Sequence, residues 1–599
     1  MLKSHTCGEL RSQDAEETVS IAGWVHRRRD HGNLIFIDLR DRWGIVQVVI
    51  NPEITPDAHK TAEAIRNEWV IQIEGKVVLR QPGTENPRIE TGEIEIQAAS
   101  VSILNPSNTP PFYINDEKSE EVDELLRLQY RYLDMRRPSM TQNLELRHKV
   151  IKFMRDYLDA EGFLEVETPI LLKSTPEGAR DYIVPSRLSP GSVYALPQSP
   201  QQLKQLLMVG GIEKYFQIAR CFRDEDARSD RQPEFTQLDL EMSFVTENDV
   251  LDLTEKLFTN LIKKVTPDKK IIEPFPRLTF KEAMLRFGSD KPDLRFGMEI
   301  QELSSIAKQS NVGILKSAVE DGGVVRGINA VGCADYSRRQ IDELVELARS
   351  QGAQGLVAIN LIGDDDKVSL SGIRSSIARA LTEEDLEAIA GHFDAKNGDL
   401  ILIVAGAESV VAPALGVIRQ EMGLKMKLAP EDLLALGFIT EMPLFDWNEE
   451  ENRWDSVHHP FTAPIESDIS KVSTNPGEIM SRSYDMVCNG YEIASGSIRI
   501  HQKELQLEIF QALGYTKDEI ENQFGHLLNA FEFGAPPHGG IAPGVDRFVM
   551  LLANEETIRE VIPFPKTQAG VDPLTGAPTP AEPNQLTELG LEIANNPPK

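Results

Sequence analysis

Arginines and carboxylates alternate densely in residues 216–241, FQIARCFRDEDARSDRQPEFTQLDLE, between two apolar stretches. This pattern is typical of a hairpin with a polar loop, in which Arg223 ends one strand. A guanidinium there can bind a planar anion through two hydrogen bonds, and Glu225 can accept a bond from an exocyclic amine. A surface hairpin that carries only ion pairs would have the same composition.

A second polar cluster, residues 482–501 (RSYDMVCNGYEIASGSIRIH), has Asp485 and Glu492 on either side of Asn489-Gly490. Asn-Gly is a strong signal for a two-residue hairpin turn, so we expect the two carboxylates on neighbouring strands. Mg²⁺ takes one or two protein carboxylates and keeps most of its waters. The pair is therefore a candidate magnesium site.

A third cluster, residues 538–552 (HGGIAPGVDRFVMLL), has glycines followed by a predicted helix with Arg547 in its first turns. Small residues allow a ligand to approach the backbone, and Arg547 adds a cation; a tight loop before a buried helix is the alternative. The sequence has no GxxxxGK[ST] loop and no GxGxxG after a strand. Arginines must therefore neutralise any bound phosphate.

Composition limits the class of protein. The 599 residues are 41% hydrophobic, enough for several buried cores. The net charge of −31 excludes a generic basic nucleic-acid coat but not a local RNA-binding face. The four cysteines lie more than a hundred residues apart, which supports neither a zinc ribbon nor a disulfide framework. With no apolar leader and no run of about 18 apolar residues, we expect a soluble, cytoplasmic, multidomain protein.

The first hundred residues are rich in predicted β-strands. Alternating or β-branched runs predict three strands, a helix and two more strands, over residues 18–26, 34–40, 45–50, 57–66 (the helix), 70–79 and 93–104. This order is typical of an OB-fold, which commonly binds oligonucleotides, although any small β-barrel remains an alternative.

Beyond a proline-rich linker, residues 127–155 carry eight basic side chains against few carboxylates. Charge runs of this kind are usually solvated helix faces, and on its own the pattern favours that interpretation. Apolar residues at helical spacing predict a helix over 141–163, followed by the strand-like FLEVETPIL that ends at Pro169.

Residues 290–425 have a different sequence pattern, in which predicted strands and helices alternate between glycine-rich turns. The pattern predicts an inserted α/β module. The tail is proline-rich, so we expect it to be extended or poorly ordered. The predicted division is 1–105 (barrel), 106–140 (linker or hinge), 141–289 (first part of a main domain), 290–425 (insertion), 426–565 (second part of the main domain) and 566–599 (tail).

The predicted helix and strand that end at Pro169, the FRDE with its following EFTQLDLE, and the GVDRFVMLL helix resemble motifs 1, 2 and 3 of the class II aminoacyl-tRNA synthetases. STPEGARDY, LPQSPQQLKQLLM, DRQPEF, HHPFTAP and GIAPGVDR are similar to segments of the bacterial-type aspartyl-tRNA synthetases, including the form that charges both tRNA-Asp and tRNA-Asn. The resemblance covers about residues 1–565. It implies an α+β multidomain protein: an N-terminal OB-fold anticodon-binding barrel, a six-stranded antiparallel catalytic sheet flanked by helices, and an inserted α/β GAD module.

The resemblance also implies the reaction and its residues. Aspartate would displace pyrophosphate from ATP, and the adenylate would acylate the 3′ end of tRNA. Arg223 and Arg547 would be catalytic, and Asp485 and Glu492 would hold Mg²⁺. ATP would be bound by Arg223, Asp224, Glu225, Gln232, Glu492, Gly544, Val545, Asp546 and Arg547. Aspartate would be bound by Glu177, Gln201, Lys204, Arg223, Asp239, His458 and Arg499.

Physical chemistry agrees with the implied reaction. Displacement at phosphorus is catalysed by positioning and charge neutralisation, so no protein nucleophile is needed. Asparagine would leave Lys204 and Arg499 buried without a charged partner, which costs about 3–5 kcal/mol, or a discrimination of roughly 10²–10⁴. An editing domain is therefore not required.

For the barrel, the resemblance places the anticodon on an aromatic and basic face, where bases stack on rings and polar groups read their edges. Histidine and glycine at two loop positions resemble enzymes of relaxed tRNA specificity. The residues so implied are Arg29, His31, Phe36, Gln47 and Gly83. We therefore expect tRNA-Asp and also tRNA-Asn as substrates, and a tRNA-dependent amidotransferase partner. The resemblance further implies a homodimer with motif 1 at its interface.

Three alternatives remain at this stage. The protein could be a strictly tRNA-Asp-specific ligase, or a class II relative that activates asparagine or lysine. It could also be an inactive, synthetase-like RNA-binding protein, although that reading predicts loss of the arginines and carboxylates named above, and all are present.

Overall fold

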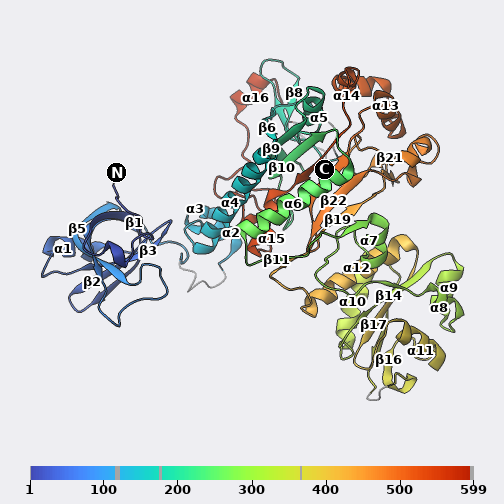
Figure 1. The fold of residues 1–599 in the computed structure, drawn as a ribbon, viewed down its shortest axis with the longest axis horizontal. Coiled ribbons are helices and arrows are strands. Elements are labelled where there is room, and N and C mark those ends of the chain that lie inside the picture. The colour runs from blue at the N-terminus through green and yellow to red at the C-terminus, as the bar shows by residue number, and fades with distance from the viewer. Residues whose placement is uncertain (1, 115–121, 175–177, 364–366, 594–599) are drawn as a thin grey trace. The chain divides into compact units, whose positions relative to one another are not determined.

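The computed structural model describes residues 2–114, 122–174, 178–363 and 367–593. The chain forms two compact units. One comprises Met1–Glu145 with Arg559–Thr579, and the other comprises Leu146–Ile558 with Pro580–Lys599. Figure 1 shows the course of the chain through both.

Five strands of the first unit close into a barrel in the order β1-β2-β3-β5-β4. They are β1 (Thr18–His31), β2 (Leu34–Asp41), β3 (Gly44–Ile50), β4 (Val70–Leu79) and β5 (Ile94–Asn105), and α1 (Pro56–Ala64) lies between β3 and β4. Alternate side chains fill the interior, as Val19, Ile21 and Val25 do along β1. The predicted order of elements is confirmed. β1 runs past residue 26 to His31, because its second half pairs with β2.

The first half of the basic stretch after the barrel belongs to the first unit and forms contacts inside it. It lies on α2 (Glu124–Gln129), α3 (Arg131–Asp134) and α4 (Pro138–Ala160), of which α4 continues into the second unit. Arg131 is buried and donates to backbone carbonyls of residues 559, 562 and 563. Arg127 binds Glu560 through two hydrogen bonds of 2.9 and 2.6 Å. For these two arginines the expected solvated helix face is wrong, because they join distant segments of one unit.

The second unit is built on an eight-stranded sheet. In order across the sheet its strands are β12 (Arg277–Thr279), β19 (Leu436–Thr440), β22 (Ser483–Cys488), β23 (Tyr491–Ile498), β24 (His538–Pro543), β10 (Glu234–Ser243), β9 (Lys214–Phe222) and β6 (Leu164–Glu165). The six central strands pair antiparallel, as expected. The short edge strands β12 and β6 add parallel pairs to the expected six.

Six helices of this unit contribute buried apolar side chains to its core. They are α5 (Gln201–Val209), α6 (Glu247–Val265), α7 (Phe280–Phe287), α13 (Lys503–Ala512), α14 (Lys517–Phe531) and α15 (Val545–Ala553). A capping box begins α14: the hydroxyl of Thr516 accepts the backbone N–H of Glu519, and the carboxylate of Glu519 accepts the backbone N–H of Thr516. Phe510 of α13 and Phe524 of α14 stack with ring centroids 4.3 Å apart, next to the buried Phe461.

Residues 301–425 form a separate five-stranded sheet with its own helices. Its strands, in the order β13-β14-β17-β15-β16, are β13 (Gln301–Glu302), β14 (Val324–Ala330), β17 (Leu400–Gly406), β15 (Val357–Leu361) and β16 (Ile373–Ser375), and its helices are α8 (Ser304–Gln309), α9 (Gly313–Glu320), α10 (Arg338–Ser350), α11 (Glu383–His392) and α12 (Glu408–Lys425). The described pairs of this sheet are all antiparallel, and β17 lies between β14 and β15.

The strand β17 lies between two apolar cores, one on each face of the inserted sheet. Leu400 and Leu402 belong to one apolar core, whereas Ile401 and Ile403 belong to another on the opposite face. A strand covered on both faces reads as a continuous apolar run, which is the pattern of LILIV in this strand.

Three two-stranded sheets and a short helix complete the described structure. The sheets are β7 (Ile183–Pro185) with β8 (Val193–Ala195), β11 (Lys270–Ile271) with β18 (Leu433–Leu434), and β20 (Phe445–Asn448) with β21 (Arg453–Ser456). The described part of the tail forms turns and the helix α16 (Pro583–Leu589), where an extended or poorly ordered chain was expected. Among the described residues, no helix has the length and apolar character needed to cross a membrane.

Candidate active site

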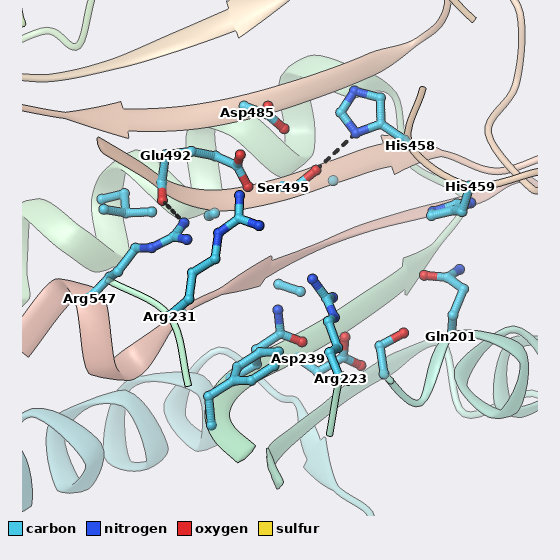
Figure 2. A pocket seen from close by; sticks show the side chains of 18 of the residues that line it. Gln201, Arg223, Arg231, Asp239, His458, His459, Asp485, Glu492, Ser495 and Arg547 are labelled. Atoms are coloured by element: carbon cyan, nitrogen blue, oxygen red, sulfur yellow. Dashed lines mark hydrogen bonds between the residues drawn. The ribbon is translucent and has the colours of Figure 1, made fainter. Parts of the chain in front are cut away.

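A cavity of about 420 Å³ lies over the sheet of the second unit. Figure 2 shows side chains from strands of the sheet, from α5 and from α15 pointing into it. Of the sequence-predicted residues, thirteen line this cavity: Gln201, Lys204, Arg223, Glu225, Gln232, Asp239, His458, Asp485, Glu492, Arg499, Gly544, Asp546 and Arg547. Residues hundreds of positions apart in the sequence therefore share one site.

Three fully buried charged side chains, Lys204, Asp239 and Arg499, line the floor of the cavity, and the buried Glu241 pairs with two of them from beneath. Nζ of Lys204 lies 2.7 Å from Oδ1 of Asp239 and 3.3 Å from Oε2 of Glu241. The guanidinium of Arg499 donates to both carboxylate oxygens of Glu241, at 3.0 and 3.2 Å. Buried charges are stable only when paired in this manner. Burial raises the pKa of Asp239, although Lys204 opposes that effect, whereas in Glu241 Arg499 and Lys204 outweigh burial and lower the pKa.

Two neighbouring histidines close one side of the cavity and remain uncharged. Burial, and secondarily the charge of Arg499, lowers the pKa of His458 to about 4 and that of His459 well below its ordinary value. Nδ1 of His458 lies 3.1 Å from the hydroxyl of Ser495, and Nε2 of His459 lies 2.8 Å from Nη1 of Arg499. A neutral imidazole can accept this bond from the guanidinium, which a charged one could not.

Arg223 presents a positive charge that no described carboxylate neutralises within ion-pair distance. It follows β9 directly, and its backbone N–H donates to the carbonyl of Pro233. Its guanidinium lies 5.1 Å from the ring centre of Phe235. The ring holds the guanidinium without neutralising it. The predicted hairpin of β9 and β10 is confirmed, with Phe222 opposite Glu234.

Arg547 lies in the first turn of α15 and is held by backbone carbonyls as well as by a carboxylate. Nη1 donates to the carbonyl of Glu492 at 2.6 Å, and Nη2 lies 3.1 Å from a carboxylate oxygen of Asp230. In Figure 2 it points into the cavity beside Arg231, which carries a second guanidinium to this end. Two cations at one end of the cavity provide a site for a polyanion.

The two predicted metal carboxylates come together across the predicted hairpin. Asn489 and Gly490 turn between β22 and β23 with φ of 51° and 88°, the left-handed values of a type I′ turn. Burial and the charge of Glu492 raise the pKa of Asp485 well above its ordinary value, and Oδ1 of Asp485 is buried with no hydrogen-bond partner among the described residues. An unpartnered carboxylate oxygen beside a second carboxylate fits a hard divalent cation.

The remaining predicted residues have other positions. Glu177 lies outside the described residues. Of the described side chains, those of Asp224 and Val545 are not part of the cavity lining; Asp224 is bridged to Arg180 and Val545 is buried in the core. Asp546 accepts the backbone N–H of Thr236 at 2.7 Å, which fixes α15 against β10.

Several residues that contribute to the cavity were not predicted from the sequence. Glu241 pairs with both buried cations, Lys204 and Arg499, although it does not line the cavity. The only sequence signal for its role was its position two residues after Asp239 on the same strand, which places both side chains on one face. His459 also lines the cavity, and the sequence offered no signal to separate its role from that of the adjacent His458. The other unpredicted lining residues that carry polar groups are Ser199, Asp230, Arg231, Gln237, Asp290 and Ser495.

In the first unit the structure brings three of the five predicted barrel residues together. Nη2 of Arg29 lies 2.8 Å from Asp38 and 3.1 Å from Gln47, and its guanidinium lies 6.0 Å from the ring centre of Phe36. His31 is at the end of β1 and exposed. Gly83 is in the loop between β4 and β5 with φ of 88°, a value that favours glycine.

Comparison with family models places this geometry in a known class. Residues 123–568 match the model described as "tRNA synthetases class II (D, K and N)", and residues 19–104 match "OB-fold nucleic acid binding domain". The chain therefore belongs to the class II tRNA synthetases of the D, K and N group, a family of ATP-dependent ligases.

Curated relatives are similar over the whole chain. The "Aspartate--tRNA(Asp/Asn) ligase" of Dehalococcoides mccartyi (strain 195) is 55% identical over 596 residues, covering 99% of each chain. The protein of the same description from Rubrobacter xylanophilus is 51% identical, covering 99% of this chain and 97% of its own. The "Aspartate--tRNA ligase" of Geobacillus kaustophilus is 50% identical, covering 99% of each.

Among solved structures, the asparaginyl-tRNA synthetase of Pyrococcus horikoshii complexed with asparaginyl-adenylate has a TM-score of 0.58 at 19% identity. The match covers 95% of this chain and 99% of that one. At this identity the similarity supports the fold alone.

Proposed function

We propose that this chain is an aspartate–tRNA ligase. It activates L-aspartate with ATP and transfers the aspartyl group to the 3′ end of tRNA-Asp. The observation that carries the proposal is one cavity in which Lys204 and Arg499 form a buried cationic floor and Arg223 and Arg547 supply further cations. The curated relatives at 50–55% identity support the choice of aspartate.

In the first step an α-carboxylate oxygen of aspartate attacks the α-phosphorus of ATP. The new P–O bond replaces the bond to pyrophosphate, which leaves. Arg223 is suited to stabilise the charge that develops at phosphorus, because no described carboxylate neutralises it. Arg547 is suited to hold the departing phosphates. Positioning and charge neutralisation are sufficient for such a displacement.

In the second step the terminal hydroxyl of tRNA attacks the carbonyl carbon of the adenylate and releases AMP. No side chain is required as a nucleophile in either step. His458 and His459 are uncharged at neutral pH, so they act here as hydrogen-bond partners that keep Ser495 and Arg499 in place.

The chemistry of the donor set suits Mg²⁺, which neutralises phosphate charge when it is bound with ATP. Asp485 and Glu492 are the residues that would hold it, since Oδ1 of Asp485 is buried with no partner in the described part of the chain and the two carboxylates repel each other. The arginines remain responsible for orienting the α-phosphate.

The chain is also proposed to charge tRNA-Asn, as the descriptions of several relatives state for those proteins. The anticodons of the two tRNAs differ in their third base, so contacts from the loops that carry His31 and Gly83 can decide between them. Asp-tRNA-Asn would then need a tRNA-dependent amidotransferase to become Asn-tRNA-Asn. A strictly tRNA-Asp-specific ligase is the alternative.

We further propose a homodimer formed through the segment that follows α4. β6 is an edge strand of the large sheet, and Leu164, Ile170 and Leu171 are about half exposed. Exposed apolar side chains along an open sheet edge are typical of an interface between chains. Sedimentation of the wild type and of Leu164→Lys tests this proposal: a dimer is expected for the former and a monomer for the latter.

The predicted domain limits are retained as part of the proposal, with the barrel (1–105) reading the anticodon and residues 141–289 and 426–565 carrying catalysis around the 290–425 insertion. A cytoplasmic location follows from the proposed substrates, ATP and tRNA.

Pyrophosphate exchange into ATP with each amino acid tests the proposed activation step. Exchange with aspartate alone is expected, and exchange with asparagine or lysine in its place would contradict the proposal. Acylation of tRNA-Asp and tRNA-Asn transcripts, measured side by side, then decides the tRNA range. If tRNA-Asn is not acylated at enzyme levels that fully charge tRNA-Asp, the strict alternative is correct.

A further inference from the structure

Trp43 is an exposed aromatic side chain flanked by cations, in the turn between β2 and β3. It is 58% exposed, the most exposed of the five tryptophans. Nζ of Lys3 lies 4.7 Å from the indole ring centre, and the guanidinium of Arg42 lies 5.4 Å from it. An exposed aromatic ring between two cations combines the two groups that bind single-stranded nucleic acid, a stacking surface and a charge for phosphate.

The turn that presents Trp43 is rigid. The carboxylate of Asp41 accepts the backbone N–H of Trp43 and of Cys7, both at 2.9 Å, and pairs with Lys3 at 3.0 Å. The backbone of Gly8 packs so closely on the turn that an added Cβ would come within 2.0 Å of the Trp43 carbonyl oxygen. A ring held in this way loses little conformational entropy when a ligand stacks on it.

The cations at this site can serve a ligand. Arg42 pairs with Glu145 at 3.2 Å, but the side chains are 60% and 36% exposed, and such a pair is worth little in water. Its guanidinium can therefore turn to a phosphate. The same combination, an arginine beside an aromatic ring, occurs at Arg29 and Phe36 on the same barrel.

Trp43 lies too far from Phe36 to contact the same bases. Phe36 lies five residues before Asp41, the end of β2, which is about 16 Å at roughly 3.3 Å per residue, and Trp43 follows in the turn beyond that end. Three stacked bases are separated by two steps, or about 7 Å at about 3.4 Å per step. A ligand on Trp43 therefore lies outside the anticodon triplet if Phe36 binds within it.

We propose that Trp43, with Lys3 and Arg42, is a second RNA contact of the barrel, which stacks on a nucleotide of tRNA outside the anticodon and neutralises its phosphate. Base stacking on aromatic rings tolerates any base, and arginine and lysine supply the charge complementarity. The inference rests on the proposed function, because it requires that tRNA is the substrate.

Kinetics with Trp43→Ala test this contact. The KM for full-length tRNA-Asp should rise by about five-fold to a hundred-fold, the range expected for loss of one stacked base. The increase should be the same for transcripts with an altered anticodon, and absent for an acceptor-stem minihelix. Trp43→Phe should restore most of the affinity. Leu104→Ala, which removes an exposed apolar side chain elsewhere on the barrel, is the matched control.

Pyrophosphate exchange separates the two proposals. If the wild type exchanges with aspartate and charges tRNA, but Trp43→Ala leaves the KM for tRNA unchanged, the RNA contact is wrong and the ligase assignment is not affected. If Trp43→Ala does not fold, Arg42→Gln takes its place. That variant should raise the KM two- to three-fold and reduce by about one the slope of log affinity against log salt; an unchanged slope would overturn the inference.

Discussion

The ammonium of Lys204 and the carboxylate of Asp239 form a buried ion pair of 2.7 Å. Glu241 and Arg499 continue the network on its other side. The four charges balance, so the floor of the cavity can remain buried without a ligand. A substrate with an ammonium and a side-chain carboxylate can exchange partners with this network without leaving a charge unpaired, whereas a substrate with a neutral side chain, such as asparagine, cannot.

Lys204→Met should abolish activation of aspartate. Pyrophosphate exchange is expected to fall by about 10³ or more, because the substrate carboxylate loses one of two buried cations, and the fold should lose about 3–5 kcal/mol because Asp239 keeps a buried charge without its nearest partner. Adding Asp239→Leu should restore most of the stability but none of the exchange. Lys152→Met, which breaks an exposed pair with Asp156, should change neither.

The pH dependence of stability should report the buried histidines. The pKa of His458 is about 4 in the folded protein, because of burial and the charge of Arg499, against about 6.5 when unfolded. Between these values the unfolded chain binds more protons than the folded one. Stability is therefore complete above about pH 6.5 and falls as the pH drops toward 4, by up to about 3 kcal/mol from this residue.

His458→Gln should remove that part of the slope. Urea unfolding midpoints at pH 7 and pH 5, compared between wild type and variant, measure the difference. His459 acts in the same direction and remains in the variant, so a reduced slope is expected, not a flat one. A slope equal to that of the wild type would show that His458 does not stay neutral in the fold.

Much of the site could be predicted because short-range signals marked its turns and arginines. Asn489-Gly490 fixed the hairpin that brings Asp485 to Glu492, and the alternation in residues 216–241 identified β9 and β10. Glu241 was missed because its role depends on a cation 258 positions away, which no local pattern records.

The fold was less predictable where elements are very short or pair in non-sequential order. The edge strands β6 and β12 have two and three residues, too few for any periodicity. In the inserted sheet, β17 lies between β14 and β15 and pairs antiparallel with both. The alternation of strands and helices along the sequence does not specify that strand order.

Magnesium dependence should change when either carboxylate of the hairpin is made neutral. Glu492→Gln is expected to raise at least ten-fold the Mg²⁺ concentration that gives half-maximal pyrophosphate exchange, and Asp485→Asn to act in the same direction, because each removes one of two anionic oxygen donors. Asp455→Asn, in the β20–β21 hairpin, serves as the control. An unchanged magnesium titration in both variants would exclude this pair as the metal site.

The choice between the two tRNAs should depend on the exposed hairpin of the barrel. His31 ends β1 opposite Leu34 and no described contact ties its ring to the barrel, so the imidazole is available to an RNA base. His31→Ala is expected to lower kcat/KM for tRNA-Asn about ten-fold, the value of one polar contact of roughly 1.4 kcal/mol, and that for tRNA-Asp less than two-fold. Asn33→Ala, in the same turn, controls for a change in the hairpin itself. Equal losses for both tRNAs would show that His31 contributes affinity without specificity.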